Sequence, residues 1–329
     1  MKFSEIYRPI NKGLSKVEEI LLRAPRNESF SGVAELGNFI LKNKGKRLRP
    51  ATALLFSGAS SVGRPFKAGR TLLNTAAAIE LIHAASLVHD DVIDDSSLRH
   101  NKLTVNSKWG NELAIVLGDY LYCAAFDIIA DGGLNERVMR RIIHATRLMC
   151  EGEVLQIHER ENSTLLKERY ISIIEKKTAS LFELSCRCGV MLSKGSKARE
   201  EAAAAFGLNF GIAFQMTDDY LDIASGQSSL GKTPGLDFKK GELTLPFLNL
   251  AAQSEQRNKI RKLIKSSESR SAFLELRRLF LNSPANDMTR NEILGYIRKA
   301  RKSLDAFEGS PFKKSLYDIT CYLEDRAKV

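Results

Sequence analysis

Two short runs of aspartate contain the side chains best suited to chemistry in this sequence. Each run follows a long apolar stretch, and the carboxylates are Asp90, Asp91, Asp94 and Asp95 in the first and Asp218, Asp219 and Asp222 in the second. Both have the form DDxxD, whose first and last aspartates lie one helical turn apart on one face. Like charges at that spacing repel, and buried carboxylates are costly without partners. The two runs therefore predict carboxylates that face each other across a cavity and hold divalent cations.

Magnesium suits such a site, because it takes oxygen ligands and its coordination is completed by substrate phosphates. Basic residues that a diphosphate would need occur around the two runs. They are Lys46, Arg47 and Arg49 in GKRLRP (45–50), Arg99 behind the first run, Lys177 beside Thr178, and Lys232 after Gly231. Around paired acidic clusters, such residues are typical of phosphate contacts.

The elements that must position these residues are helices. Apolar residues recur at helical spacing over 14–23, 32–42, 68–95, 112–130, 136–160, 165–193, 198–224, 245–251, 256–265, 270–282, 290–307 and 312–325. Strand patterns with tight turns are missing, and breakers such as Pro284 fall between the helical stretches, with Pro50 expected to stop a helix. We expect an all-α fold with one domain over residues 1–329. Stretches 68–95 and 198–224 are apolar around most of their circumference, as buried central helices are.

Composition excludes several other classes of protein. Of the 329 residues, 43% are hydrophobic and 27% are charged, which is ordinary for a globular protein and argues against disorder. No continuous apolar run approaches the roughly 18 residues that cross a bilayer, and the start of the chain lacks the apolar core of a secretory signal. Five cysteines without a CxxC pair indicate reduced thiols. We therefore expect a cytoplasmic protein.

The net charge of +11 favours anionic partners such as phosphorylated metabolites, anionic lipid surfaces or nucleic acid. Residues 251–329 supply much of this excess. The sequence contains no recognisable nucleic-acid-binding module, so we expect no nucleic-acid partner.

A series of motifs, in this order and spacing, is specific for one family. The motifs are GKRLRP (45–50), DDVID (90–94) with Arg99 behind it, LGDYLYCAAF (117–126), KKTASL (176–181), DDYLD (218–222) and GKTPGLDFKKGELTLP (231–246). On these residues the chain resembles the trans-type isoprenyl (polyprenyl) diphosphate synthases, most of all the octaprenyl and other long-chain enzymes, over nearly its whole length. The resemblance implies an isoprenoid-synthase-type helical bundle around a deep central cavity, and a homodimer.

The resemblance also implies a reaction between two substrates, isopentenyl diphosphate and an allylic diphosphate. The allylic diphosphate ionises, isopentenyl diphosphate attacks the carbocation, and a proton is lost to the departing diphosphate. Magnesium, as three ions with substrate bound, would stabilise the leaving diphosphate. By resemblance, Asp90 and Asp94 ligate magnesium on one side and Asp218 on the other. Asp91 and Asp222 would support them through water or hydrogen bonds.

Contacts with the substrates are implied in the same way. The leaving diphosphate would be stabilised by Arg99, Lys177 and Lys232. The diphosphate of isopentenyl diphosphate would be held by Lys46, Arg49 and His83, the last of which lies two helical turns before Asp90. Thr178 and Gln215 would line the path of the cation with their dipoles.

Two positions depart from the family pattern. The family usually has two arginines after the first motif, and here the second is His100, which weakens one contact to isopentenyl diphosphate and makes binding pH-dependent. The family often has lysine after the glycine of the last motif, where this chain has Glu242. This change removes a positive charge from the allylic diphosphate site. Neither departure removes a metal ligand.

The length of the product should depend on how far the growing tail extends before it meets a bulky side chain. One turn before Asp90 lie Ala85 and Ser86, which are small, and Ile82 follows on the next turn. Each unblocked turn of about 5.4 Å admits roughly one more isoprene unit. We expect a medium- or long-chain product of octaprenyl-like length, with a quinone side chain as its destination.

Three alternatives stay open beside this reading. The nearest is a geranylgeranyl or farnesyl diphosphate synthase, and a second is the regulatory subunit of a heteromeric synthase, although such subunits tend to lose the acidic motifs. A terpene cyclase would normally have an Asn/Ser/Glu metal motif in place of the second DDxxD. The basic C-terminal region predicts peripheral contact with anionic membranes, where a long prenyl product partitions.

Overall fold

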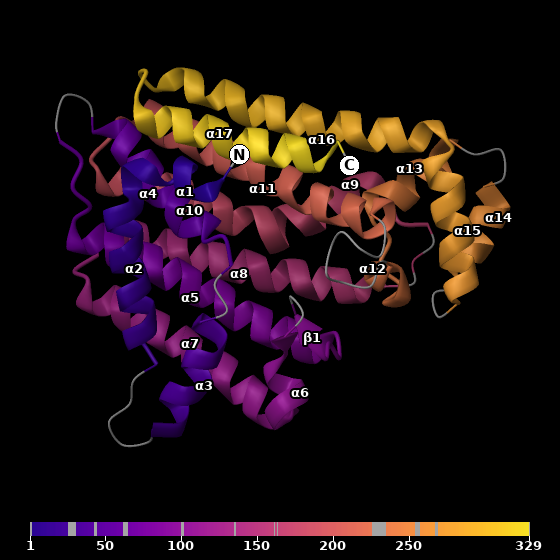
Figure 1. Cartoon of the computed structure of the whole chain (residues 1–329), viewed down its shortest axis with the longest axis horizontal. Helices are drawn as coiled ribbons and strands as arrows, with labels where there is room; N and C mark the ends of the chain where they lie inside the picture. The colour runs from indigo at the N-terminus through magenta and orange to yellow at the C-terminus, as the bar shows by residue number, and fades with distance from the viewer. Residues whose placement is uncertain are drawn as a thin grey trace. The chain divides into compact units, whose positions relative to one another are not determined.

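The computed structural model describes residues 2–25, 31–42, 45–61, 65–99, 102–134, 136–160, 162, 164–225, 235–253, 257–266 and 269–328. In the first half of the chain the elements are α1 (Phe3–Ile6), η1 (Arg8–Ile10), α2 (Asn11–Arg23), α3 (Ser31–Leu41), α4 (Leu48–Ser60), α5 (Arg70–Ile93), β1 (Leu98–Arg99), β2 (Lys102–Leu103), α6 (Val105–Trp109), α7 (Asn111–Asp131) and α8 (Glu136–His158). In the second half they are α9 (Lys167–Ile174), η2 (Glu175–Ala179), α10 (Ser180–Leu192), α11 (Lys197–Ala224), α12 (Leu236–Lys239), α13 (Leu245–Gln253), α14 (Arg257–Ile264), α15 (Arg270–Leu281), α16 (Pro284–Ser303), η3 (Leu304–Ala306) and α17 (Pro311–Arg326). The all-α prediction is confirmed (Figure 1).

The chain divides into two compact units, each made of three separate segments. The first unit comprises Met1–Thr146, Leu181–Gly207 and Ser303–Asp318, and the second comprises Arg147–Ser180, Leu208–Lys302 and Ile319–Val329. The expectation of a single domain over residues 1–329 stays a prediction, as does the deep central cavity.

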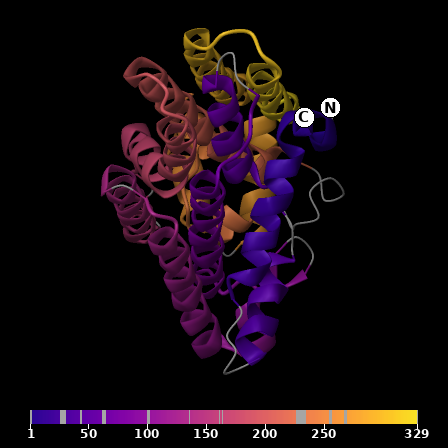
Figure 2. The ribbon, with the colours of Figure 1, turned by 90° about the vertical axis from the view of Figure 1, so that its left-hand side faces the viewer.

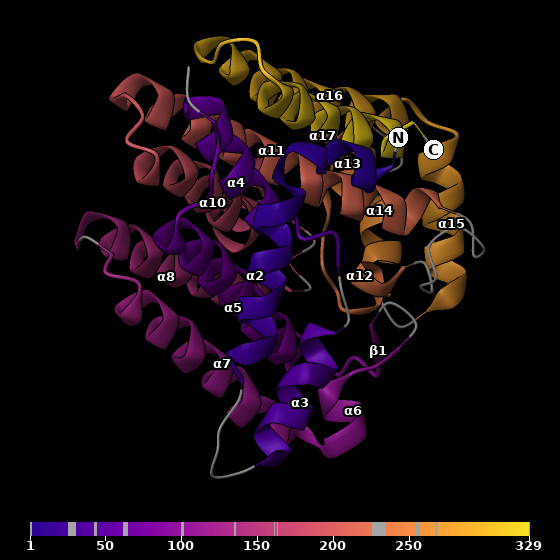
Figure 3. The same ribbon diagram turned by 60° about the vertical axis from the view of Figure 1, so that its left-hand side comes forward.

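Helix α5 is the centre of the first unit. It packs along α7 and also contacts α2 and α4 (Figures 2 and 3). The approach to α7 depends on Gly118, because a Cβ at that position would collide with the ring of His89. The His89 imidazole in turn meets the carbonyl of Ile115, 3.0 Å from its Nε2. Stretch 68–95 is thus a central helix, as its apolar circumference predicted.

Helix α4 was not predicted, and Pro50 does not stop a helix as expected. Pro50 stands in the first turn of α4, where the missing N–H would have had no intrahelical partner. All residues of α4 except Arg49 are buried. A helix buried all round has no apolar stripe to reveal it. Pro284, which was expected to separate helices, likewise begins α16.

A small antiparallel hairpin follows α5, with Leu98 opposite Leu103 and Arg99 opposite Lys102. Its strands have two residues each, so the sequence offered no alternating pattern to detect. Behind it, α6 begins at a true N-cap, since the Thr104 hydroxyl accepts the N–H of Ser107.

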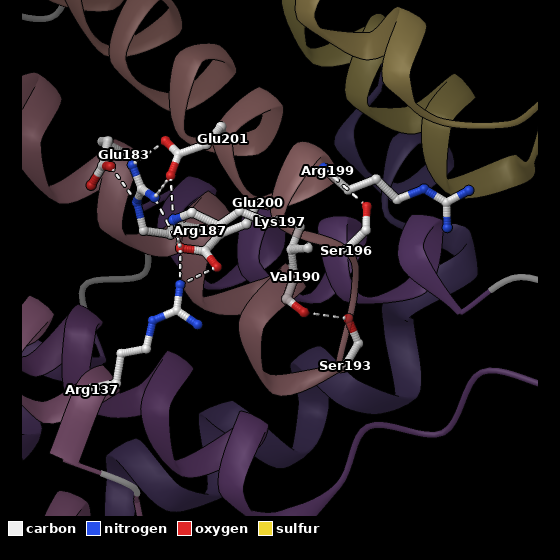
Figure 4. Close-up of polar contacts among 10 residues, drawn as sticks. All are labelled: Arg137, Glu183, Arg187, Val190, Ser193, Ser196, Lys197, Arg199, Glu200 and Glu201. Atoms are coloured by element: carbon white, nitrogen blue, oxygen red, sulfur yellow. Dashed lines mark hydrogen bonds and ion pairs between the residues drawn. The ribbon is translucent and has the colours of Figure 1, made fainter.

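A buried ion-pair network ties α8, α10 and α11 together within the first unit (Figure 4). Arg187 of α10 lies 2.6 Å from Glu183 and 3.0 Å from both Glu200 and Glu201, and Arg137 of α8 lies 2.6 Å from Glu200. The side chains of Arg187 and Glu200 are only 8% and 3% exposed. Buried pairs of this kind are costly to break, since removing one member leaves the other charge uncompensated.

The stretch 165–193 was predicted as one helix but contains a π-helical segment, which lies in the second unit. Helix α9 continues into η2, which has π-helical hydrogen bonding, and then into α10. Nothing in the residue types of η2 distinguishes it from α-helix. Helices α13, α14 and α15 pack against one another in this unit (Figure 1). Arg277 of α15 caps the end of α11 by donating to the carbonyls of Ile223 and Ala224 at 2.9 and 3.1 Å.

Among the residues that the structure describes, two helices are long and apolar enough, by length and composition alone, to span a membrane, although no uninterrupted apolar run predicted this. They are α5, with 72% of its most apolar window buried, and α7, with 39% buried. Burial of α5 fits the core helix of a folded domain, which passes the same test.

Candidate active site

The first aspartate run lies at the C-terminal end of α5. Asp90 and Asp91 stand in its last turn, and Asp94 is its C-cap. Asp91 is buried, whereas Asp90 and Asp94 are half-buried. Carboxylates at a helix C-terminus face the negative end of the helix dipole, so they need cations to be stable there.

Arg99 supplies one such cation to Asp91. Its Nε lies 2.9 Å from Oδ1 and 3.2 Å from Oδ2 of Asp91, and Nη2 lies 2.9 Å from Oδ1. The amide of Asn106 also donates to the Asp91 carbonyl at 3.2 Å. Asp91 thus ties the hairpin to the end of α5. This contact agrees with a supporting role for Asp91, and the phosphate contact of Arg99 stays a prediction.

The predicted isopentenyl diphosphate residues His83 and Arg49 share one electrostatic environment. Burial, with the positive charges of Arg49, Arg99 and Arg47, lowers the pKa of His83 well below its ordinary value. Its imidazole is therefore neutral and can present a donor or an acceptor.

Arg49 is half-buried, and the Nε of its guanidinium is buried. Burial lowers its pKa to about 10, against the opposing effect of Glu80. Its guanidinium lies 4.4 Å from the ring centroid of Phe182, and its Nε has no hydrogen-bond partner among the described residues. A buried donor without a partner is costly, so this group is suited to an anion.

The neighbouring cations of GKRLRP differ from Arg49. Lys46 is exposed, and its carbonyl accepts the Tyr7 hydroxyl at 2.8 Å. Arg47 instead serves the fold, because it lies 2.6 Å from Glu18 and 3.0 Å from Glu80. Lys46 lines a surface depression of about 430 Å³ between the first helices and this motif.

In the second unit, the second aspartate run occupies the last turns of α11. Asp218 is 42% exposed and forms an ion pair at 2.9 Å with Arg326 of α17. The carboxylate of Asp222 accepts the backbone N–H groups of Leu236 and Asp237, both at 3.3 Å, which fixes the start of α12. Arg326 was missed by the sequence reasoning, since no motif contains it.

Thr178 and Gln215, which were predicted together, are in contact within the second unit. The Thr178 hydroxyl donates to Oε1 of Gln215 at 2.8 Å, and Nε2 of Gln215 donates to Oδ1 of Asp219 at 2.8 Å. The Tyr170 hydroxyl donates to the other oxygen of Asp219 at 2.7 Å. Burial is the main cause that raises the pKa of Asp219 to about 7, and the charges of Asp218 and Glu242 add to it.

Lys177 lies beside Thr178 in the π-helical segment η2 and forms an ion pair with Glu153 of α8. Gly152 permits this close approach, because a Cβ there would lie 2.8 Å from the Lys177 Cα. Short π-helical segments occur often at functional sites. The predicted residues His100 and Lys232 lie outside the described part of the chain.

Two further acidic residues of the last motif belong to this region. Burial, followed by the charges of Asp222, Asp219 and Glu242, raises the pKa of Asp237 well above its ordinary value. Glu242, which stands where the family often has lysine, is 3.3 Å from Arg160. The negative charge of Glu242 is thus neutralised by a residue from another segment. The sequence alone gave no reason to single out Arg160.

The predicted chain-length residues differ in exposure. Ala85 and Ile82 are fully buried, whereas Ser86 is half-buried and donates its hydroxyl to the His83 carbonyl at 2.8 Å. Of the three, only Ser86 presents accessible surface. Their role in setting product length stays a prediction.

The oxygen-only side chains of both runs suit a hard cation such as magnesium. In the part of the chain that the structure describes, no three His, Cys, Asp or Glu side chains are arranged as a complete metal site. Ligands from a substrate would complete such a coordination sphere, as is usual for magnesium bound through phosphates.

Comparison with known proteins gives a consistent result. The sequence model of the polyprenyl synthetase family matches residues 31–277. An octaprenyl diphosphate synthase of Haemophilus influenzae is 31% identical over 99% of this chain and 98% of its own length. A short chain isoprenyl diphosphate synthase of Methanothermobacter thermautotrophicus is 32% identical over 99% and 97%, respectively. A polyprenyl synthase of Caulobacter crescentus, crystallised with calcium and isoprenyl diphosphate, superposes with a TM-score of 0.90 at 28% identity over 98% of this chain and 97% of that chain.

Proposed function

The chain belongs to the polyprenyl synthetase family and is a prenyltransferase, and from this premise we propose that it is a magnesium-dependent trans-polyprenyl diphosphate synthase. The observation that carries the proposal is the position of the two aspartate runs, at the C-terminal ends of the long helices α5 and α11. Carboxylates are unfavourable at that end of a helix unless cations are bound to them.

The substrates would be isopentenyl diphosphate and an allylic diphosphate. The C1–O bond of the allylic diphosphate breaks and its electron pair leaves with the diphosphate. The double bond of isopentenyl diphosphate then forms the new C–C bond with the allylic carbon. A proton lost from the adduct to the departing diphosphate restores a double bond. The product is an allylic diphosphate longer by one isoprene unit.

Asp90, Asp94 and Asp218 would hold magnesium, with Asp91 and Asp222 in support. When bound, magnesium supplies Lewis-acid stabilisation to the leaving diphosphate. The residues of the chain neutralise the remaining charge, with Lys177 and Lys232 assigned to the allylic diphosphate. The calcium complex of the Caulobacter crescentus relative supports metal-assisted binding of a diphosphate in this family.

Isopentenyl diphosphate would be bound by Arg49 together with Lys46, His83 and His100. The buried Nε of Arg49 supports this role, since an anion would supply the missing acceptor. The neutral imidazole of His83 can donate one hydrogen bond without adding charge.

The proposed product is a medium or long chain of octaprenyl-like length. The small residues Ala85 and Ser86 and the octaprenyl relative support this length, while the short-chain relative keeps geranylgeranyl and farnesyl diphosphate as alternatives. The purified protein should be incubated with magnesium, labelled isopentenyl diphosphate and farnesyl diphosphate, and the products separated by chain length. A ladder ending well beyond four isoprene units supports the proposal, and a stop at four units would contradict the assigned length.

We also propose a homodimer, formed through the outer face of α7. Apolar side chains exposed on this helix include Ile115, Val116 and Phe126, of which Val116 is 63% exposed. A long apolar face left in water is typical of a protein interface.

A cytoplasmic location with peripheral contact to anionic lipid is part of the same proposal, supported by the net charge of +11.

A further inference from the structure

A continuous chain of hydrogen bonds runs through four side chains of the second unit. It leads from the Thr178 hydroxyl to Gln215, from the Gln215 amide to one oxygen of Asp219, and is completed by the Tyr170 hydroxyl on the other oxygen. The three distances are 2.8, 2.8 and 2.7 Å. Asp219 and Tyr170 are 5% and 3% exposed, so water does not compete for these bonds.

The backbone brings these four residues into register. Gln215 and Asp219 are four residues apart on α11 and share one face. Tyr170 and Thr178 are eight residues apart, whereas two turns of α-helix take only about 7 residues. The wider i→i+5 turn of η2 winds more slowly, which returns Thr178 to the face of Tyr170.

The direction of the bonds fixes the amide of Gln215. Both oxygens of Asp219 accept hydrogen bonds, so Gln215 must turn Nε2 towards Asp219 and Oε1 towards Thr178. Reversal of the amide would place its oxygen against the carboxylate of Asp219 and its nitrogen against the Thr178 hydroxyl. The orientation of Thr178 is therefore determined three hydrogen bonds away, at Tyr170.

We propose that Tyr170 and Asp219 are positioning residues, which hold Gln215 and Thr178 in the orientation that prenyl transfer uses, and that Asp219 is not a metal ligand although it lies in DDYLD. The proposal rests on the proposed function. Small errors in the position of reacting groups strongly lower the reaction rate, so such a network affects catalysis directly.

Three single variants test the proposal: Tyr170→Phe, Asp219→Asn and the control Tyr220→Phe. Tyr220 is an equally buried tyrosine on α11 whose hydroxyl donates to Oδ1 of Asn286 at 3.1 Å. We expect Tyr170→Phe to lower kcat about tenfold, with KM for both diphosphates and the half-saturating magnesium concentration unchanged. Asp219→Asn should lower kcat further, roughly a hundredfold, because asparagine has only one acceptor oxygen for the two donors, Gln215 and Tyr170.

Tyr220→Phe should lose as much thermal stability as Tyr170→Phe and keep its kcat. In a Gln215→Leu background, Tyr170→Phe should lower kcat no further, since it acts through Gln215. Wild-type kcat in Tyr170→Phe would overturn the proposal, as would a raised magnesium requirement in Asp219→Asn. If Asp219→Asn does not fold, Tyr170→Phe alone and in the Gln215→Leu background still tests whether the network positions Gln215. Failure of the wild-type protein to condense the substrates would instead overturn the proposed function.

Discussion

Arg47 and Arg49 are separated by one residue, but their guanidinium groups have different partners and opposite effects on stability. Arg47 is enclosed by two carboxylates, those of Glu18 and Glu80, at 2.6 and 3.0 Å. Arg49 is half-buried, its buried Nε has no hydrogen-bond partner in the described part of the chain, and the ring of Phe182 lies 4.4 Å from its guanidinium. The first arginine therefore stabilises the protein, while we propose the second as a binding group whose buried Nε costs stability unless an anion is present.

Replacing each arginine by methionine separates these two roles. Arg49→Met should raise KM for isopentenyl diphosphate roughly tenfold or more, because a charge-assisted hydrogen bond is lost. Its free energy of unfolding should change by no more than about 1 kcal/mol, since an unsatisfied buried donor is removed. Arg47→Met is the matched control. It should lower the free energy of unfolding by about 3 kcal/mol, because two carboxylates lose their cation. Urea unfolding and steady-state kinetics measure both. Equal stability losses in the two variants would contradict this division.

The lowered pKa of His83 predicts a pH dependence of stability. The folded protein keeps His83 neutral, whereas the unfolded chain protonates it below its ordinary pKa of about 6.5. Folding is therefore penalised increasingly as the pH falls below about 6.5, by up to roughly 1.4 kcal/mol per pH unit from this group. His83→Asn should lessen the loss of stability between pH 6.5 and pH 5.5. His144→Asn replaces an exposed histidine and is the control. If His83→Asn loses as much unfolding free energy as the wild type between pH 6.5 and pH 5.5, the account of His83 is wrong.

At the scale of the element, close backbone contact brings Lys177 next to α8. Gly152→Ala would place a methyl group against the backbone of Lys177 in η2. We expect a loss of about 2 kcal/mol in the free energy of unfolding from this collision. The displaced η2 should also lower kcat, because Lys177 and Thr178 move with it. Gly295→Ala is the control, since nothing lies near a Cβ at that helical position. An unchanged Tm and kcat in Gly152→Ala would show that η2 adapts freely.

The elements also show what a sequence can predict here. Helices α5, α7 and α11 were predicted within two residues at each end, because long amphipathic or wholly apolar stretches dominate them. Helix α4 was missed because Pro50, which was expected to stop a helix, instead stands in its first turn. The π-helical turn of η2 and the partners of Arg47, Glu242 and Asp218 depend on tertiary packing. No local pattern of residues specifies them.

At the scale of the whole molecule, the exposed apolar face of α7 should be covered by a second copy. Val116→Lys should shift the protein from dimer to monomer. Val116 is 63% exposed in the single chain, and the charge of a lysine at this position would be buried in the dimer interface. Leu274→Lys changes an apolar side chain of 51% exposure on α15 and should leave the dimer intact. Sedimentation velocity distinguishes the two species. A dimeric Val116→Lys protein would place the interface elsewhere.

The most direct test of the central claim is the magnesium dependence of labelled isopentenyl diphosphate incorporation by three proteins. They are the wild type, the double variant Asp90→Asn/Asp94→Asn and the single variant Asp218→Asn. If each aspartate run holds magnesium for the diphosphate, both variants should lose incorporation by a factor of at least about 100, with a higher magnesium requirement in any residual activity. Folded variants that incorporate at the wild-type rate and at the same magnesium concentration would contradict that role.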